Sequence, residues 1–153
     1  MPPSPLKPSA ASPVYKVLLV DDDAAMRRAI PRLLSPELDV IAASSAREAL
    51  LFLARGEVFD AAIVDLQMPG IDGRQTIDLL LKVSPLLGER AVILTSGAVD
   101  PELQKWAEGL GATRMLHKPP DRDLLIQTIT QRIELFPEKP LIPTKSTLRP
   151  KKR

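Results

Sequence analysis

Five short apolar runs alternate along this chain with segments that have helical periodicity. The apolar runs cover residues 15–20, 39–43, 61–65, 91–94 and 114–118, and the helical segments cover 24–34, 46–54, 73–83, 100–110 and 121–135. Short apolar runs are typical of strands buried on both faces of a parallel sheet. The alternation predicts an α/β fold, in which helices cover both faces of a five-stranded parallel sheet through right-handed crossovers.

The third apolar run ends at a carboxylate. Ala61 to Val64 lead into Asp65, and the following Met-Pro-Gly-Ile-Asp-Gly is rich in the residues that favour loops. Ligands of open α/β sheets bind at the carboxyl ends of the strands. A single carboxylate in this place is also explained by a helix cap or a loop hydrogen bond. The choice therefore depends on the other strands.

Polar residues follow three more of the predicted strands. Asp21, Asp22 and Asp23 follow the first, Thr95 follows the fourth, and Lys118 ends the fifth. Since the strands are expected to be parallel, these side chains should meet at one edge of the sheet. One of the three adjacent Asp can cap the next helix. A hard cation such as Mg²⁺ explains the cluster better than a cap alone.

These residue types suit phosphoryl transfer. A carboxylate such as Asp65 can attack phosphorus and form an aspartyl phosphate. Mg²⁺ and Lys118 would each neutralise a phosphoryl oxygen, and the Thr95 hydroxyl could donate to another. The sequence has neither a Gly-x-x-x-x-Gly-Lys-Ser/Thr loop nor a Gly-x-Gly-x-x-Gly motif, so a nucleotide is not the expected ligand.

Residues 14–135 resemble the receiver domain of two-component response regulators. The resemblance rests on Val-Leu-Leu-Val-Asp-Asp-Asp, Val-Asp-Leu-Gln-Met-Pro-Gly-Ile-Asp-Gly, Leu-Thr-Ser-Gly and His-Lys-Pro-Pro, in that order. It implies a flavodoxin-like, doubly wound sheet with strand order 2-1-3-4-5. It also implies a signalling switch, located in the cytoplasm, that receives phosphoryl groups from a sensor histidine kinase or a phosphotransfer protein.

The resemblance assigns a role to each polar residue. Asp65 is the expected phosphoacceptor, Thr95 the switch hydroxyl and Lys118 the phosphoryl-binding lysine. In the family, the bond between this lysine and the following proline is often cis. The expected Mg²⁺ ligands are Asp21, Asp22, Asp65 and the backbone carbonyl of Gln67. Of the pair Asp21 and Asp22, Asp22 is the one expected to contact the ion directly.

Two positions depart from the family pattern. Met115 stands where receivers usually have Tyr or Phe, and a methionine has no ring or hydroxyl with which to signal. Pro31 lies inside the first predicted helix, where it should cause a kink or a local distortion. Phosphorylation should survive both changes, whereas the usual readout through position 115 should not.

The resemblance also implies partners. A downstream protein should bind the face formed by the predicted helix 101–110, the fifth strand and the last helix, and a homodimer is a further option. Trp106 lies on this face, although ordinary packing explains this residue better than a partner contact does. His117, the single histidine, should point away from Lys118 by strand alternation.

The sequence is also compatible with two other functions. One is a receiver-like scaffold that binds partners without phosphorylation, which Met115 favours. The other is a Mg²⁺-dependent phosphohydrolase with Asp65 as nucleophile. Such enzymes usually have a second acid two residues later, where this chain has Gln67.

The two ends of the chain differ in composition from the middle. Nine of the 16 Pro lie in residues 1–13 and 136–153, and both ends are expected to be disordered. Residues 136–153 carry six Lys or Arg and one Glu, so with Lys7 the formal net charge of +2 leaves about −4 for residues 14–135. The basic tail could contact nucleic acid weakly through charge alone. The chain has no cysteine and no apolar run long enough to span a membrane.

Overall fold

The computed structural model describes residues 14–67, 73–95, 101–110 and 115–138. Its elements, in chain order, are β1 (Tyr15–Val20), α1 (Ala24–Leu34), β2 (Leu38–Ala43), α2 (Ala46–Ala54), β3 (Ala61–Asp65), α3 (Gly73–Val83), α4 (Pro85–Glu89), β4 (Val92–Thr95), α5 (Pro101–Leu110), β5 (Met115–His117) and α6 (Arg122–Leu135). The predicted N-terminal end 1–13, residues 139–153 of the predicted tail 136–153, residues 68–72 after β3, and residue 100 of the predicted helix 100–110 lie outside the described residues.

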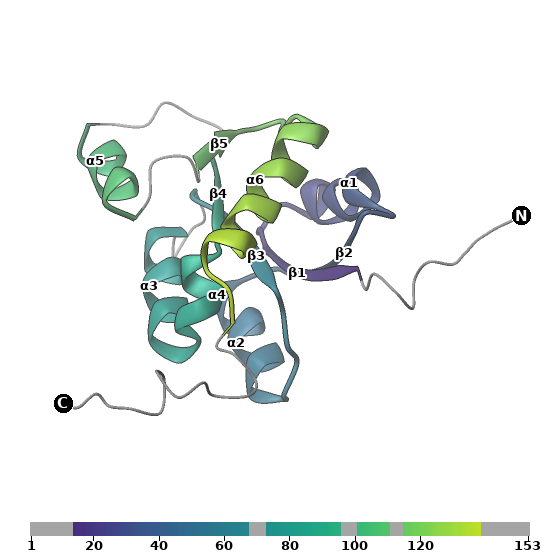
Figure 1. Ribbon diagram of the computed structural model, residues 1–153, viewed down its shortest axis with the longest axis horizontal. Coiled ribbons are helices and arrows are strands. Elements are labelled where there is room, and N and C mark those ends of the chain that lie inside the picture. Colours follow the sequence, from purple (N-terminus) through teal and green to yellow (C-terminus); the bar gives the residue numbers. More distant parts are fainter. Residues whose placement is uncertain (1–13, 68–72, 96–100, 111–114, 139–153) are drawn as a thin grey trace, which may run out of the picture.

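The five strands form one parallel sheet in the order β2-β1-β3-β4-β5 (Figure 1), which confirms the predicted α/β fold and strand order. The central strands are apolar because both of their faces are covered. Residues Val17 to Val20 of β1 and Ala61 to Val64 of β3 have no exposed surface. The core is therefore divided into two layers by the sheet.

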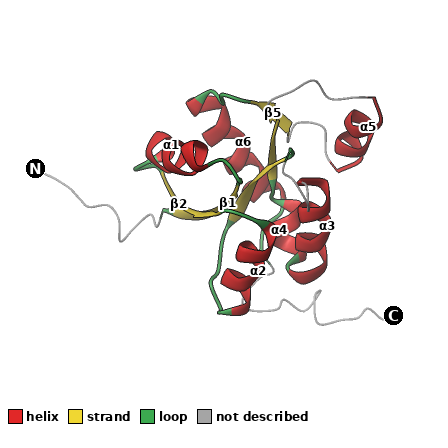
Figure 2. Ribbon diagram, turned by 180° about the vertical axis from the view of Figure 1, so that it is seen from behind, coloured by secondary structure: helices red, strands yellow, loops and turns green. Residues whose placement is uncertain are grey.

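One layer lies between the sheet and α1 and α6, and includes Ile30, Leu34, Leu125 and Ile129. The other lies beneath α2, α3 and α4, and includes Ile77, Leu80 and Leu87, with Trp106 of α5 packed against it. Figures 1 and 2 show α1 and α6 on one side of the sheet, apart from α2, α3 and α4. This doubly wound arrangement leaves the carboxyl ends of the strands free to form a site.

Capping side chains and one glycine define the ends of the helices. Ser45 caps α2 by accepting a hydrogen bond from the Glu48 amide (3.1 Å), and Glu48 accepts in turn from the Ser44 amide (2.6 Å). Asp121 caps α6 by accepting from the Leu124 amide at 2.8 Å. Gly56 ends the α2 region with φ of 91°, a backbone conformation that glycine adopts without strain.

Three details differ from the sequence prediction or add to it. The five-residue helix α4 was not expected. Leu124 adjoins the buried Leu125 and has the same apolar side chain, but it is 46% exposed, because the buried stripe of α6 follows Leu125, Thr128, Ile129, Arg132 and Ile133. The helix α1 continues through Pro31 to its last residue, Leu34.

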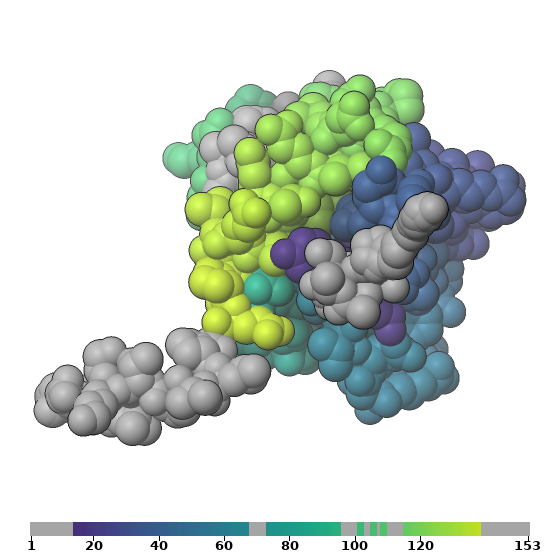
Figure 3. Space-filling model, turned by 45° about the vertical axis from the view of Figure 1, so that its right-hand side comes forward, coloured from purple at the N-terminus to yellow at the C-terminus, as the bar shows by residue number. Residues whose placement is uncertain are grey.

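The chain after α6 is held against the start of the sheet. The buried Arg90 side chain donates to the carbonyl of Phe136 (2.8 Å) and to that of Asp60 (3.0 Å). The guanidinium of Arg132 lies 4.9 Å from the centre of the Phe136 ring. In Figure 3 the start of β1 (purple) lies beside the last turn of α6 and the residues that follow it (yellow). Phe136, the first residue after α6, is thus packed against the folded domain.

Candidate phosphoacceptor and metal site

The four strand ends singled out in the sequence meet at one edge of the sheet. The ladder continues past the strands, because the Asp21 amide donates to Ala43, the Leu66 amide to Leu94 and the Lys118 amide to Thr95, at 2.8–3.1 Å. These bonds fix the backbone on which Asp21, Asp65 and Lys118 stand. Main-chain pairing, which needs no particular side chains, therefore brings together residues that are far apart in sequence.

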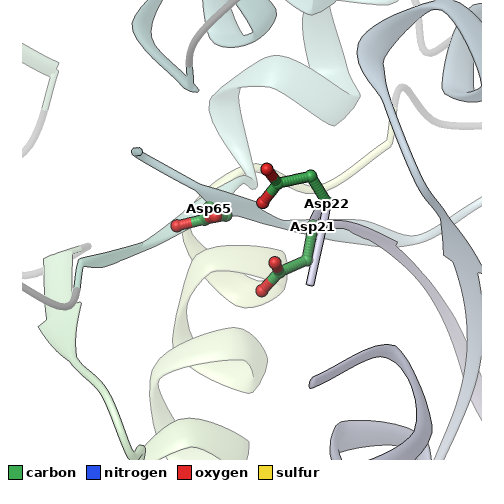
Figure 4. Close-up of side chains that lie close together, drawn as sticks. All are labelled: Asp21, Asp22 and Asp65. Carbon is green, nitrogen blue, oxygen red and sulfur yellow. The ribbon is translucent and has the colours of Figure 1, made fainter. Parts of the chain in front are cut away.

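Three carboxylates gather at this edge. Oxygen atoms of Asp21, Asp22 and Asp65 all lie within 4.8 Å of one another. Figure 4 shows Asp21 and Asp22 extending from the end of β1 toward the side on which Asp65 lies. Asp21 and Asp65 are buried, with 0% and 2% of their surface exposed, whereas Asp22 is exposed. The cluster is therefore reached from solvent on the Asp22 side.

The third aspartate of the run has a separate role. Asp23 is the N-cap of α1 and accepts a hydrogen bond from the Ala25 amide at 2.8 Å. Its own amide donates to Asp21 Oδ1 at 2.9 Å. Helix capping thus explains one of the three adjacent carboxylates and leaves Asp21 and Asp22 for the site.

Lys118 connects two of the buried carboxylates. Its Nζ atom lies 3.0 Å from Asp21 Oδ2 and 3.3 Å from Asp65 Oδ1, and the lysine side chain is only 13% exposed. Burial alone would lower the pKa of Lys118, but its hydrogen bond to Asp21 and the charges of Asp21 and Asp65 outweigh this and raise it. Lys118 is therefore firmly protonated at neutral pH.

The pKa of Asp65 is raised to about 6 from its ordinary value of 3.8. Burial is the main cause and the nearby charge of Asp21 adds to it, while the Gln67 amide (3.2 Å) and Lys118 act in the opposite direction. The carboxylate is thus held in an unfavourable charged form at neutral pH. A further cation beside it would relieve that cost.

The donor set fits a divalent cation. Three carboxylates carry three negative charges, and Lys118 offsets one of them, which leaves about two in this cluster. Carboxylate oxygens are the ligands that Mg²⁺ prefers, and Mg²⁺ needs few protein ligands because it keeps several waters. The charge and the oxygen donors of the cluster therefore suit a divalent cation.

The Thr95 hydroxyl is directed toward the same edge from the end of β4. It is buried and donates to the side-chain oxygen of Gln67 at 3.2 Å. Gln67 was predicted to contribute its backbone carbonyl to the metal; its contact with Thr95 through the side chain was not foreseen. The structure therefore links Thr95 to the β3–α3 connection as well as to its neighbours in the sheet.

Three residues singled out in the sequence lie outside the cluster. His117 has an exposed side chain, as strand alternation predicted, while Lys118 reaches into the site. Trp106 is partly buried and packs against the core layer that contains Ile77 and Ile93. Met115, at the position usually held by an aromatic residue, packs against the same layer.

Comparison with known proteins identifies the family. The sequence model of the response regulator receiver domain matches residues 17–130. The chain belongs to the response regulator receiver family. Receivers are the signalling switches of two-component systems, and the site described above lies within the matched region.

Relatives with curated descriptions agree with this assignment. The chain is 37% identical over 118 residues to the response regulator protein FleR of Pseudomonas aeruginosa. The aligned region covers 76% of this chain and 24% of FleR. It is 31% identical over 117 residues to the transcriptional regulatory protein FixJ of Bradyrhizobium diazoefficiens, covering 76% of this chain and 56% of FixJ. The chain thus spans only part of these relatives, which contain further sequence.

Solved structures show the same fold. A response regulator receiver domain protein from Clostridium thermocellum matches with a TM-score of 0.69 and 28% identity, over 80% of this chain and 96% of that one. A sensor protein from Polaromonas sp. JS666 matches with a TM-score of 0.71 and 28% identity, over 82% and 100%. Among the described residues of this receiver, no helix is both long enough and apolar enough to cross a bilayer.

Proposed function

We propose that this receiver is phosphorylated on Asp65 by a phosphohistidine of a sensor histidine kinase or a phosphotransfer protein. The observation that carries the proposal is the placement of a buried Asp65 carboxylate 3.3 Å from Lys118 and within 4.8 Å of Asp21 and Asp22. This combination supplies a nucleophile together with the charges that phosphoryl transfer needs.

The proposed reaction forms an acyl phosphate. A carboxylate oxygen of Asp65 attacks phosphorus, the bond between phosphorus and the histidine nitrogen breaks, and the released imidazole takes up a proton. Lys118 would then move part of its interaction from Asp65 to a phosphoryl oxygen. The Thr95 hydroxyl would donate a hydrogen bond to another phosphoryl oxygen. It would give up its present hydrogen bond of 3.2 Å to the side-chain oxygen of Gln67.

Asp21, Asp22 and Asp65, with the backbone carbonyl of Gln67, would hold the Mg²⁺ ion. When bound, Mg²⁺ supplies positive charge that neutralises a phosphoryl oxygen. Asp22 is exposed, so its carboxylate is accessible to an ion that arrives from solvent. Asp21 already accepts from Lys118 and from the Asp23 amide, which suits it to positioning the lysine.

The expected output of phosphorylation is a change in protein contacts. The receiver would act in the cytoplasm and bind its downstream partner through the face formed by α5, β5 and α6, or pair with a second copy of itself there. A constitutive scaffold is the second candidate function, because Met115 lacks the ring that usually carries the signal. A phosphohydrolase is disfavoured by Gln67, an amide where such enzymes usually have an acid.

Intact mass after incubation with acetyl phosphate tests the proposal. In this reaction Asp65 attacks phosphorus and acetate leaves. We expect the wild-type chain to gain one phosphoryl group with Mg²⁺ and none with a chelator. We expect Asp39→Asn, which removes an exposed carboxylate of β2, to behave as wild type. A wild-type chain that neither gains mass nor binds beryllofluoride would support the scaffold, and steady turnover of a generic phosphate ester would support the phosphohydrolase.

A further inference from the structure

A contact between charge and aromatic ring joins α3 to α5. The guanidinium carbon of Arg74 lies 5.5 Å from the centre of the Trp106 ring, a distance at which a cation is attracted to the face of an indole. Arg74 is the second residue of α3, and Trp106 lies in the middle of α5. The contact therefore connects the helix that follows the phosphoacceptor to the helix of the expected output face.

The start of α3 is fixed to the backbone of the phosphoacceptor. The Gly73 amide donates to the Leu66 carbonyl at 3.1 Å. A Cβ atom at Gly73 would lie 2.5 Å from Leu66 Cα and still closer to the Asp65 carbonyl oxygen, so only glycine fits there. Arg74 follows a residue that is packed against the backbone of Asp65 and Leu66, so a shift of the acceptor backbone would also move Arg74.

The position of Arg74 is electrostatically unusual. A helix N-terminus carries partial positive charge, so a cation in the first turn is repelled by its own helix. The ring of Trp106 compensates by attracting that cation. Added negative charge on nearby Asp65 would attract the same guanidinium, so the ring and the modified acceptor would compete for Arg74.

Trp106 lies in the region where the usual readout residue is missing. Met115, which pairs with Ile93 across β4 and β5, packs against the same core layer as Trp106. A methionine offers neither a ring to reorient nor a hydroxyl to donate. Trp106 provides a ring on this side of the sheet, on a helix rather than on a strand.

We propose that the Arg74–Trp106 contact carries the state of Asp65 to the surface of α5, in place of the aromatic residue missing at position 115. The inference rests on the proposed phosphorylation of Asp65. Charge added at the acceptor draws Arg74 away from the ring, and Trp106 then changes its exposure to solvent and to partners. Arg74 is a positioning residue in this account, because it acts through Trp106 and not on the phosphoryl group.

Trp106 is the single tryptophan of the chain, so its fluorescence reports on this contact directly. The experiment measures acrylamide quenching of Trp106 with Mg²⁺ alone and with Mg²⁺ and beryllofluoride, a phosphoryl stand-in, while ¹⁹F NMR reports whether beryllofluoride is bound. The variants are Arg74→Gln and, as a matched control, Lys82→Gln, which removes an exposed cation from the last turn of α3.

In the wild-type chain, we expect bound beryllofluoride to change the acrylamide quenching constant of Trp106 by about two-fold. A change of this size is consistent with the loss of one cation–π contact at a partly exposed site. Arg74→Gln should show the altered quenching before beryllofluoride is added and no further change afterwards. Lys82→Gln should behave as wild type.

Bound beryllofluoride with unchanged quenching would overturn the inference and leave the proposed phosphorylation intact. An equal effect of Lys82→Gln and Arg74→Gln would also overturn it, because the cause would then be general charge. No bound fluoride signal would contradict the proposed function itself, and the inference would fall with it.

Discussion

Lys118 Nζ lies 3.3 Å from Asp65 Oδ1, although Lys118 directly follows β5, Asp65 ends β3, and β4 lies between these strands. The lysine crosses this gap because Asp21, at the end of β1, also attracts it from 3.0 Å. One buried cation therefore stabilises two buried carboxylates in the resting protein. This arrangement makes the stability of the fold and the proposed chemistry depend on the same three side chains.

Removing Lys118 should destabilise the receiver. Lys118→Met leaves Asp21 and Asp65 buried without their shared cation, which should lower the free energy of unfolding by roughly 2–4 kcal/mol at pH 7.5. Mg²⁺ should restore part of this loss, because it replaces the missing positive charge. Urea denaturation with Mg²⁺ and with a chelator measures both effects.

Lys16→Met is the matched control for that measurement. Lys16 forms an exposed ion pair with Glu57, and such pairs contribute about 0–1 kcal/mol. Equal losses for Lys16→Met and Lys118→Met would contradict a special role of the buried pair.

The raised pKa of Asp65 predicts how Asp65→Asn changes stability with pH. The folded state binds the Asp65 proton more tightly than the unfolded chain, since the pKa is about 6 when folded and 3.8 ordinarily. Stability from this group is therefore present below pH 4 and is lost as pH rises to 6. Asp65→Asn should raise the free energy of unfolding by roughly 1–3 kcal/mol at pH 8 without metal, and by little at pH 4.

Denaturation of both chains across that pH range, with a chelator present, tests the sign. Asp39→Asn should differ from wild type by less than about 0.5 kcal/mol throughout, because it changes an exposed surface position. A constant gain for Asp65→Asn at every pH would show that the raised pKa is not its cause.

Gly73→Ala should damage the site through the backbone. Its Cβ would overlap the backbone of Asp65 and Leu66, so we expect a loss of roughly 2–4 kcal/mol and weaker beryllofluoride binding. Gly109→Ala, in α5 with no atom near its added Cβ, should be neutral or stabilising by up to about 1 kcal/mol. Thermal denaturation ranks the two variants, and similar values for both would refute the close approach at Gly73.

The end of the folded domain can be located by truncation. A chain ending at residue 138 keeps the Phe136 carbonyl that accepts from Arg90, whereas a chain ending at residue 135 loses it. Because Arg90 is buried, that loss should lower stability by roughly 1–3 kcal/mol. Equal stability of the two truncated chains would place the functional boundary at the end of α6.

Much of the fold could be predicted because the pattern is local. Apolar runs bounded by Asp21, Asp65 and Thr95 indicated the strands and their polar ends, and helical periodicity indicated the segments that form α1, α2, α3, α5 and α6. Helix α4 was missed because five residues are too few for a periodic pattern, although Ser84-Pro85 is a helix-start signal.

The remaining features of the site depend on long-range contacts. The pairing of Lys118 with Asp21, the bond from Thr95 to the Gln67 side chain, and the stacking of Arg74 on Trp106 join segments 28–97 residues apart, or separate helices. Periodicity and spacing place polar residues at one edge of the sheet, but they do not specify which of those side chains form hydrogen bonds or ion pairs with one another.

The central claim is that Asp65 itself becomes phosphorylated, and locating the phosphoryl group tests it most directly. Acyl phosphates are reduced by borohydride, which converts the modified aspartate to homoserine and marks its position for peptide mass mapping. After treatment with acetyl phosphate and Mg²⁺, we expect the mark at Asp65 alone, and none when Mg²⁺ is removed. A mark at Asp21 or Asp22, or an unmarked chain that carries the added phosphoryl mass, would contradict the account.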